Sequence, residues 1–351
     1  MKSLQLFFAS LISALFLISC EKEELPQFDN TGDYSDGFFV VNEGTQTTGS
    51  ISYVKSDFSS VKNDIFTTEN ASASGIGGYV QSVFFHDEKA FIISGSNLVT
   101  VVNRNTFKLI GRINTGLVNP RYGVVANGKA YITNSNTFSF DNAATGNTDD
   151  FLAVVNLETL QVESTINMNS IADKILLING KLYVSGGLYG EGNSLNIINP
   201  QTNTIETTLT FGNSPNSMEA YNGKLYVLSS NYTAESQLTK IDLSTDTIEN
   251  TITLPATLGN AQNLNVENNQ IYFTVGKKVF ASSIASSTIS DVPVFESGAQ
   301  NLYGFVVKNS AIYITDSKDY ISNGQVLVYS TSGVLAYQIG VGLIPNGVYF
   351  N

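Results

Sequence analysis

The sequence predicts an all-β protein, a seven-bladed β-propeller closed by a C-terminal strand that joins the first blade. A turn followed by a short strand with an aromatic residue recurs along the chain of 351 residues. Successive copies are 40 to 52 residues apart, the spacing of four-stranded propeller blades, and their aromatic residues are Phe39, Phe91, Tyr131, Tyr183, Tyr226, Tyr272 and Tyr313. Beyond the N-terminal segment, no long stretch has the 3.6-residue apolar period of a helix.

The first 19 residues have the features of a bacterial lipoprotein signal peptide. Lys2 provides a basic start, and the apolar run over 4–18 is short for a membrane-spanning helix. Leu-Ile-Ser at 17–19 precedes Cys20, as in a lipobox, where the cysteine is acylated and becomes the mature N-terminus. Cys20 is the only cysteine, so lipidation leaves no thiol for catalysis or metal binding. The alternative is an ordinary secretory signal with a chance cysteine.

Residues 20–35 are predicted to be a lipidated, flexible tether. They contain Pro26 and Gly32 and lack apolar periodicity. The acidic stretch Glu-Lys-Glu-Glu at 21–24 resembles the surface-export tag of Bacteroidota lipoproteins. These features predict a protein anchored by lipid to the outer membrane and exposed at the cell surface. The alternative is that the charged stretch is only a solvated tether.

The body, residues 36–351, is built from two recurring units. The first begins with Asn-Gly, the strongest short signal for a β-hairpin, at 127–128, 179–180 and 222–223. The second is a strand, a polar turn and another strand, with Val-Val-Asn at 101–103 and 154–156. We assign it to the hairpin between the third and fourth strands of a blade.

These units place the ends of the seven blades near residues 70, 115, 168, 212, 258, 298 and 343. The tail 345–350 then has the character of one more inner strand. We expect it to complete the first blade, because such closure removes the free sheet edges that invite aggregation. The runner-up is a β protein of two domains.

The composition excludes several classes of function. A net charge of −12 and a pI of about 4.5 argue against binding to nucleic acid or to anionic lipid. His86 is the only histidine and lies in a predicted turn, which disfavours a catalytic triad and excludes a two-histidine metal site. The chain has no tryptophan, unlike the docking motifs of quinoprotein propellers. We therefore expect no enzyme activity, cofactor or metal.

In a propeller, the segments entering each inner strand converge with the loops between second and third strands on one face. Fold analogy alone places a binding site there. The candidate residues on the entry segments are Tyr79, Gln81, Arg121, Tyr122, Asp173, Asn216, Asn263, Asn301, Tyr303 and Asn346. The candidates on the second-to-third-strand loops are Phe138, Tyr189, Tyr232 and Tyr320.

Amides and tyrosines suit the recognition of a large polar ligand by hydrogen bonding and stacking. Arg121 is the sharpest candidate, since a cation is rare in these segments. Its alternative role is a salt bridge to a neighbouring blade. The alternative for each loop aromatic is packing over the rim of its own blade.

The repeats resemble those of YVTN-type, YncE-like seven-bladed propellers over nearly the whole body. A closer likeness is to DUF5074-type lipoproteins of Bacteroidota. It is carried by Val-Asn-Glu-Gly at 41–44, Ser-Ile-Ser-Tyr at 50–53, Val-Gln-Ser-Val at 80–83, Asn-Thr-Phe-Lys at 105–108 and Pro-Arg-Tyr at 120–122. This group is similar to the surface lipoproteins that capture cobalamin above a TonB-dependent outer-membrane transporter. The resemblance implies a corrinoid ligand and such a transporter as partner.

Three functional hypotheses follow. The first is capture of a nutrient at the cell surface, with cobalamin or another corrinoid as the ligand. The second is a protein-interaction scaffold, which predicts a large exposed apolar patch. The third is a carboxylate-dependent glycan lyase or hydrolase, which needs acidic residues converging at the channel mouth.

Overall fold

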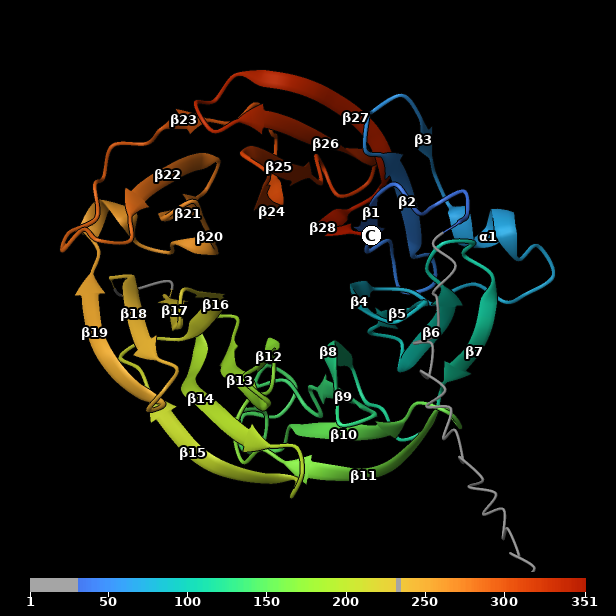
Figure 1. Ribbon diagram of the computed structural model, residues 1–351, viewed down its shortest axis with the longest axis horizontal. Helices are drawn as coiled ribbons and strands as arrows, with labels where there is room; N and C mark the ends of the chain where they lie inside the picture. The colour runs from blue at the N-terminus through green and yellow to red at the C-terminus, as the bar shows by residue number, and fades with distance from the viewer. Residues whose placement is uncertain (1–30, 232–234) are drawn as a thin grey trace, which may run out of the picture.

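The computed structural model describes residues 31–231 and 235–351, and these form seven four-stranded antiparallel sheets arranged in a ring (Figure 1). The predicted fold class and blade number are confirmed. In each sheet, one strand lies nearest the axis of the ring and the last strand lies at its rim (Figure 1). In the described ranges, no helix has the length and apolar character needed to cross a membrane.

We number the blades in chain order and give their strands from the axis outward. Blade 1 comprises β28 (Pro345–Phe350), β1 (Gly37–Asn42), β2 (Ser50–Lys55) and β3 (Val61–Lys62). Blade 2 comprises β4 (Val80–His86), β5 (Lys89–Ser94), β6 (Leu98–Asn103) and β7 (Leu109–Ile113). Blade 3 comprises β8 (Pro120–Ala126), β9 (Lys129–Asn134), β10 (Phe151–Asn156) and β11 (Gln161–Asn167).

The remaining four blades follow the same order. Blade 4 comprises β12 (Ile175–Ile178), β13 (Lys181–Leu188), β14 (Glu191–Asn199) and β15 (Thr204–Thr210). Blade 5 comprises β16 (Pro215–Tyr221), β17 (Lys224–Ser229), β18 (Gln237–Asp242) and β19 (Thr247–Thr253). Blade 6 comprises β20 (Gln262–Glu267), β21 (Gln270–Val275), β22 (Lys278–Ser283) and β23 (Phe295–Glu296). Blade 7 comprises β24 (Leu302–Lys308), β25 (Ala311–Asp316), β26 (Asn323–Ser330) and β27 (Leu335–Leu343).

The ring closes as predicted, because the C-terminal strand β28 pairs with β1 near the start of the body (Figure 1). Phe38 lies opposite Phe350, and Val40 lies opposite Val348. The ring of Phe350 also packs against Tyr313 of blade 7, with 5.1 Å between ring centroids. The last strand therefore joins blade 1 to blade 7 both through the backbone and through aromatic packing.

The Asn-Gly turns confirm their predicted role as tight hairpins. Asn127 and Gly128 have φ angles of 49° and 70°, and Asn179 and Gly180 have angles of 50° and 77°. Two successive positive φ angles match the twist of the flanking strands, and asparagine and glycine adopt them at low cost. In blades 3 and 4 these turns therefore set the register of the second strand, whose aromatic residue, Tyr131 or Tyr183, is buried.

Those aromatic residues also connect neighbouring blades. Tyr131 and Tyr183 are both 0 % exposed. The Tyr131 hydroxyl donates a hydrogen bond to the carbonyl of Pro200 in blade 4, at 2.8 Å. The Tyr183 hydroxyl donates to a carboxylate oxygen of Asp246 in blade 5. Each ring thus fills the space between two sheets while its hydroxyl bonds to the next hairpin.

Blade 1 departs from the regular pattern at its rim. Its last strand, β3, has two residues, and the next segment forms the helix α1 (Ile65–Glu69) instead of extending the sheet to about residue 70. Ile65 and Phe66 are buried and cover the core between blades 1 and 2. In the described ranges, the second short helix is a 3₁₀ turn over Ala256–Leu258 between blades 5 and 6. Apolar side chains from a connection therefore replace a full outer strand.

The packed body begins before residue 36, the predicted start of the propeller. Tyr34, within the predicted tether, is 0 % exposed. Its ring makes an edge contact with Tyr53, and its hydroxyl donates a hydrogen bond to Glu69 on α1 at 2.9 Å. The main chain of Tyr34 adds to this anchor, because its N–H donates to the carbonyl of Asn105 and its carbonyl accepts from Asn351 Nδ2. The signal segment, Cys20 and the tether as far as residue 30 lie outside the described residues.

Candidate functional site

A cavity of about 510 Å³ lies on the axis of the propeller. It lies on the face formed by the entry segments and the loops between second and third strands. The candidate residues that line it are Gln81, Arg121, Tyr122, Asp173, Tyr189, Asn216, Asn263, Tyr303 and Asn346. These residues come from blades that are far apart in sequence, and the closed ring brings them together.

Arg121 joins three blades at the wall of this cavity. Its Nε lies 2.7 Å from Oδ1 of Asp173, which precedes blade 4, and its Nη1 donates to Oε1 of Gln81 in blade 2 at 2.9 Å. The two charged side chains are only 12 % and 6 % exposed. Burial alone would lower the pKa of Arg121, but the charge of Asp173 outweighs it and the pKa is raised. The salt bridge to a neighbouring blade, the alternative role for Arg121, is therefore present.

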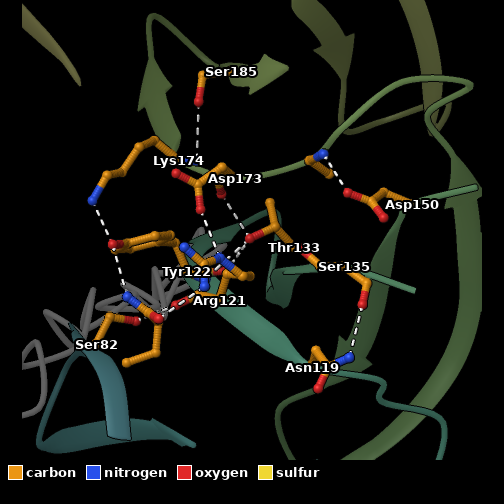
Figure 2. A network of polar contacts seen from close by, with 12 residues as sticks. Ser82, Asn119, Arg121, Tyr122, Thr133, Ser135, Asp150, Asp173, Lys174 and Ser185 are labelled. Atoms are coloured by element: carbon orange, nitrogen blue, oxygen red, sulfur yellow. Dashed lines mark hydrogen bonds and ion pairs between the residues drawn. The ribbon is translucent and has the colours of Figure 1, made fainter. Parts of the chain in front are cut away.

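The Tyr122 hydroxyl lies between two donors. Gln81 Nε2 donates to it at 3.0 Å. Lys174 Nζ also donates to it (Figure 2). Lys174 Nζ also lies 3.8 Å from the centre of the Tyr122 ring, a cation–π contact. The main-chain N–H of Lys174 donates to Ser185 Oγ at 3.1 Å (Figure 2). These bonds hold Lys174 and Tyr122 together at the cavity wall.

The cavity wall also contains amides whose N–H groups bond within the fold. Asn216 Nδ2 donates to Ser230 Oγ and to the carbonyl of Ala261. Asn346 Nδ2 donates to the carbonyl of Val80 at 2.8 Å, across the closure of the ring. These amides therefore connect blades, and Asn216 Oδ1 accepts a further hydrogen bond from Ser217 Oγ at 2.8 Å.

Tyr303 links the cavity to the loop after β1. Its hydroxyl donates to Oε2 of Glu43 at 2.8 Å, and its ring makes an edge contact with Tyr320, 6.0 Å between centroids. Burial raises the pKa of Glu43. Burial also raises the pKa of Tyr303, and the neighbouring Glu43 charge adds to the effect. The hydroxyl therefore stays protonated and remains a donor.

Four other candidates lie beyond the cavity lining. Phe138 stacks on Phe140 with 5.0 Å between ring centroids, and Tyr189 packs beside them at the cavity wall. We call Phe138, Phe140 and Tyr189 the aromatic shelf.

Tyr320 reaches the site only through Tyr303. The remaining two are Tyr79, which is 47 % exposed, and Asn301, which donates to the carbonyl of Lys318. Tyr232 lies outside the described residues.

Sequence reasoning missed three residues that shape the site. Lys174 directly follows Asp173 in an entry segment, and this position in the sequence could have identified it as a residue of the site. Glu43 follows the first strand of the body, and its contact with Tyr303 spans 260 positions. Asp150 ends the long loop over 134–150 and is 1 % exposed. A local pattern cannot reveal contacts made across the ring.

Asp150 connects that long loop to blade 4. Its two carboxylate oxygens accept hydrogen bonds from the main-chain N–H groups of Asn136 and Ala172, both at 2.9 Å. Figure 2 shows Asp150 near the segment that carries Asp173 and Lys174. Ala172 precedes Asp173, so Asp150 also positions the Arg121 ion pair. Burial raises the pKa of Asp150 to about 7, and Asp149 adds to the effect.

We expect the raised pKa of Asp150 to make the stability of the protein depend on pH. A carboxyl group with a raised folded-state pKa stabilises the fold fully below its unfolded pKa, near 3.8, and loses that contribution as pH rises to about 7. Relative to an Asp150→Asn variant, the wild type should lose about 2 kcal/mol of stability between pH 5 and pH 7. Urea unfolding followed by circular dichroism measures the difference. Asp141→Asn, in the same loop but exposed, is the control, and equal slopes for wild type and Asp150→Asn would contradict the assignment.

The fold and the cavity define the class of protein: a seven-bladed β-propeller with a polar cavity on its axis. A family model described as "Domain of unknown function (DUF5074)" matches residues 36–338. The chain therefore belongs to the DUF5074 family. A search of curated proteins finds no match to the sequence.

Similar solved structures are propellers of varied description. A quinonprotein alcohol dehydrogenase-like protein from Bacteroides thetaiotaomicron has a TM-score of 0.66 and 14% identity, covering 90% of this chain and 78% of that one. Hydrazine synthase from Kuenenia stuttgartiensis has a TM-score of 0.58 and 14% identity, covering 74% and 86%. The computationally designed Ika8 protein has a TM-score of 0.60 and 8% identity, covering 90% and 92%. At these identities the likeness shows the fold alone.

Proposed function

We propose that this protein is a binding module that captures a small polar molecule in the axial cavity. The observation that carries the proposal is the cavity itself, about 510 Å³, which lies in the size range of small-molecule sites. Its lining combines tyrosines and amides with the Arg121–Asp173 pair. Those side chains are held by hydrogen bonds between blades, so the site is formed before a ligand arrives.

The aromatic shelf extends this site beyond the cavity. Phe140 and Tyr189 are 72 % and 55 % exposed, an unusual exposure for large rings. Rings at the edge of a polar cavity offer stacking area to the planar part of a ligand too large to enter completely. A corrinoid has that size and a planar macrocycle, and the family resemblance points to the same ligand. Cobalamin is therefore the first compound to test.

The same proposal includes a location and a partner. Lipidation at Cys20 would anchor the chain to the outer membrane, with the propeller at the cell surface, and a TonB-dependent transporter would receive the ligand. The connectivity supports capture from the medium. β1 runs from Gly37 to Asn42 and ends beside the cavity, where Glu43 bonds to Tyr303. The chain therefore enters the propeller on the face opposite the cavity.

Binding without catalysis is the simpler use of this site. Among the described residues that line the cavity, the only carboxylate is Asp173, and it is in the ion pair with Arg121. Arg121 Nε donates to Asp173 Oδ1 at 2.7 Å, so this carboxylate oxygen is engaged within the fold. A glycan lyase or hydrolase would need a second carboxyl group to act opposite it. This charge arrangement favours ligand capture over the carboxylate-dependent alternative.

Isothermal titration calorimetry with cyanocobalamin tests the proposal on the full chain purified in detergent. We expect saturable binding of one ligand per chain. Tyr189→Ala should weaken it by about three- to tenfold, the range of one aromatic stacking contact. Tyr337→Ala removes another exposed tyrosine, on the rim strand β27, and should leave the affinity unchanged. No heat of binding and no co-purifying pigment would remove the corrinoid from the proposal.

A further inference from the structure

We propose that Lys174 and Tyr122 form a subsite for an anionic oxygen of the ligand, on a carboxylate or a phosphate group. The inference rests on the proposed function and specifies the chemistry of the captured molecule. Both residues line the axial cavity, on the segments that enter blades 3 and 4 (Figure 2). Three observations carry the argument: the charge of the cavity wall, the direction of its hydrogen bonds, and the donors that remain unused.

The charge of the cavity wall differs in sign from that of the whole chain. The protein has a net charge of −12. The charged residues lining the cavity are Arg121, Asp173 and Lys174, which leaves an excess of one positive charge. Asp173 is paired with Arg121 at 2.7 Å. Within residues 31–231 and 235–351, no carboxylate lies within ion-pair distance of Lys174, so its charge has no counterion in the cavity wall.

Arg121 determines the direction of the hydrogen bonds. A guanidinium group can only donate, so the atom of Gln81 that faces Arg121 Nη1 at 2.9 Å must be the amide oxygen. The Gln81 amide nitrogen then faces the Tyr122 hydroxyl at 3.0 Å and donates to it. The ammonium group of Lys174 is also only a donor and contacts the same oxygen. Both neighbours of the Tyr122 hydroxyl therefore give it hydrogens.

The Tyr122 hydroxyl consequently has its own hydrogen left to donate. No group in the described part of the chain accepts it, and the ring belongs to the cavity lining. Lys174 has two further N–H groups beyond the one directed at Tyr122. The Tyr122 hydroxyl and the Lys174 ammonium are in direct contact at the cavity wall, so their unused hydrogens are available at neighbouring positions. An anionic oxygen satisfies both, because charge-assisted hydrogen bonds are the strongest that these groups can form.

Calorimetry with inorganic phosphate and with acetate tests the subsite on the full chain in detergent, without any corrinoid. We expect saturable binding of at least one anion, and the preferred anion distinguishes a phosphate-bearing ligand from a carboxylate. Lys174→Met should weaken binding at least tenfold, and Lys174→Arg should retain most of it. Tyr122→Phe removes only the hydroxyl and should weaken binding about threefold to tenfold. Lys278→Met, at an exposed lysine on β22, should have no effect.

Thermal unfolding by circular dichroism establishes that each variant is folded. Absence of saturable binding of either anion, or equal affinity of wild type and Lys174→Met, would overturn the subsite. The test is separable from that of the proposed function. Anion binding that depends on Lys174, together with no binding of cyanocobalamin, would support the subsite and exclude the corrinoid as ligand. Corrinoid binding that is unchanged in Lys174→Met would overturn the subsite and leave the binding function intact.

Discussion

Removal of residues 345–351 is expected to abolish the folded monomer. These residues form β28, the axial strand of blade 1, and the deletion leaves β1 as an unpaired edge. It also removes Val348, which is 5 % exposed, and the Phe350 ring packed against Phe38 and Tyr313. Loss of two such side chains and a strand pairing costs on the order of 5–10 kcal/mol, comparable with the whole stability of a typical domain.

Size-exclusion chromatography and circular dichroism measure the result. The truncated chain should aggregate or lose its cooperative thermal transition, because exposed strand edges promote association. Addition of a synthetic peptide of sequence 345–351 should restore part of the folded signal, which separates the loss of this strand from a general defect of the shortened chain. A monomer that unfolds at the same temperature as the full chain would show that closure contributes little.

Replacement of Arg121 by methionine is expected to cost about 3–5 kcal/mol of stability, because it leaves the Asp173 carboxylate buried without its partner. Asp173→Asn in the same chain should recover most of this loss, since it removes the uncompensated charge. Urea unfolding followed by circular dichroism at pH 7 gives both values. The chain has no tryptophan, so fluorescence is a weaker probe.

The matched control for Arg121→Met is Lys129→Met. Lys129 pairs with Glu163, and the two side chains are 41 % and 36 % exposed, so its loss should cost less than about 1 kcal/mol. Ligand affinity should also fall in Arg121→Met, because Arg121 orients Gln81 and through it Tyr122. Equal stabilities for Arg121→Met and Lys129→Met would mean that the buried ion pair contributes no more to the free energy of unfolding than the surface pair.

The repeated units made the fold predictable because they are local. An Asn-Gly turn and the aromatic strand after it determine one hairpin without reference to the rest of the chain, as at 127–132. Copies of that hairpin stack in only a few ways, so their number and spacing indicated the ring. The tail 345–350 was assigned as a strand by its own pattern, and its pairing with β1 is confirmed.

The candidate site was predictable in position but not in chemistry. The entry segments of a propeller meet at its axis, so Gln81, Arg121 and Asp173 were expected on one face, and they share one cavity. Their partners were not expected, because hydrogen bonds such as that from Lys174 to Tyr122 join residues 52 positions apart. Whether an arginine faces a ligand or a carboxylate depends on which side chain the next blade presents.

The sequence by itself determined a closed ring of seven four-stranded blades, because hairpin turns and strand periodicity are properties of short segments. Only the tertiary structure decided that Arg121 is engaged by Asp173 while Lys174 is left with an uncompensated charge. It also decided that Tyr34 belongs to the packed core. The physical reason is the same in each case: burial, ion pairing and the direction of a hydrogen bond depend on groups that the folded ring brings together from different blades.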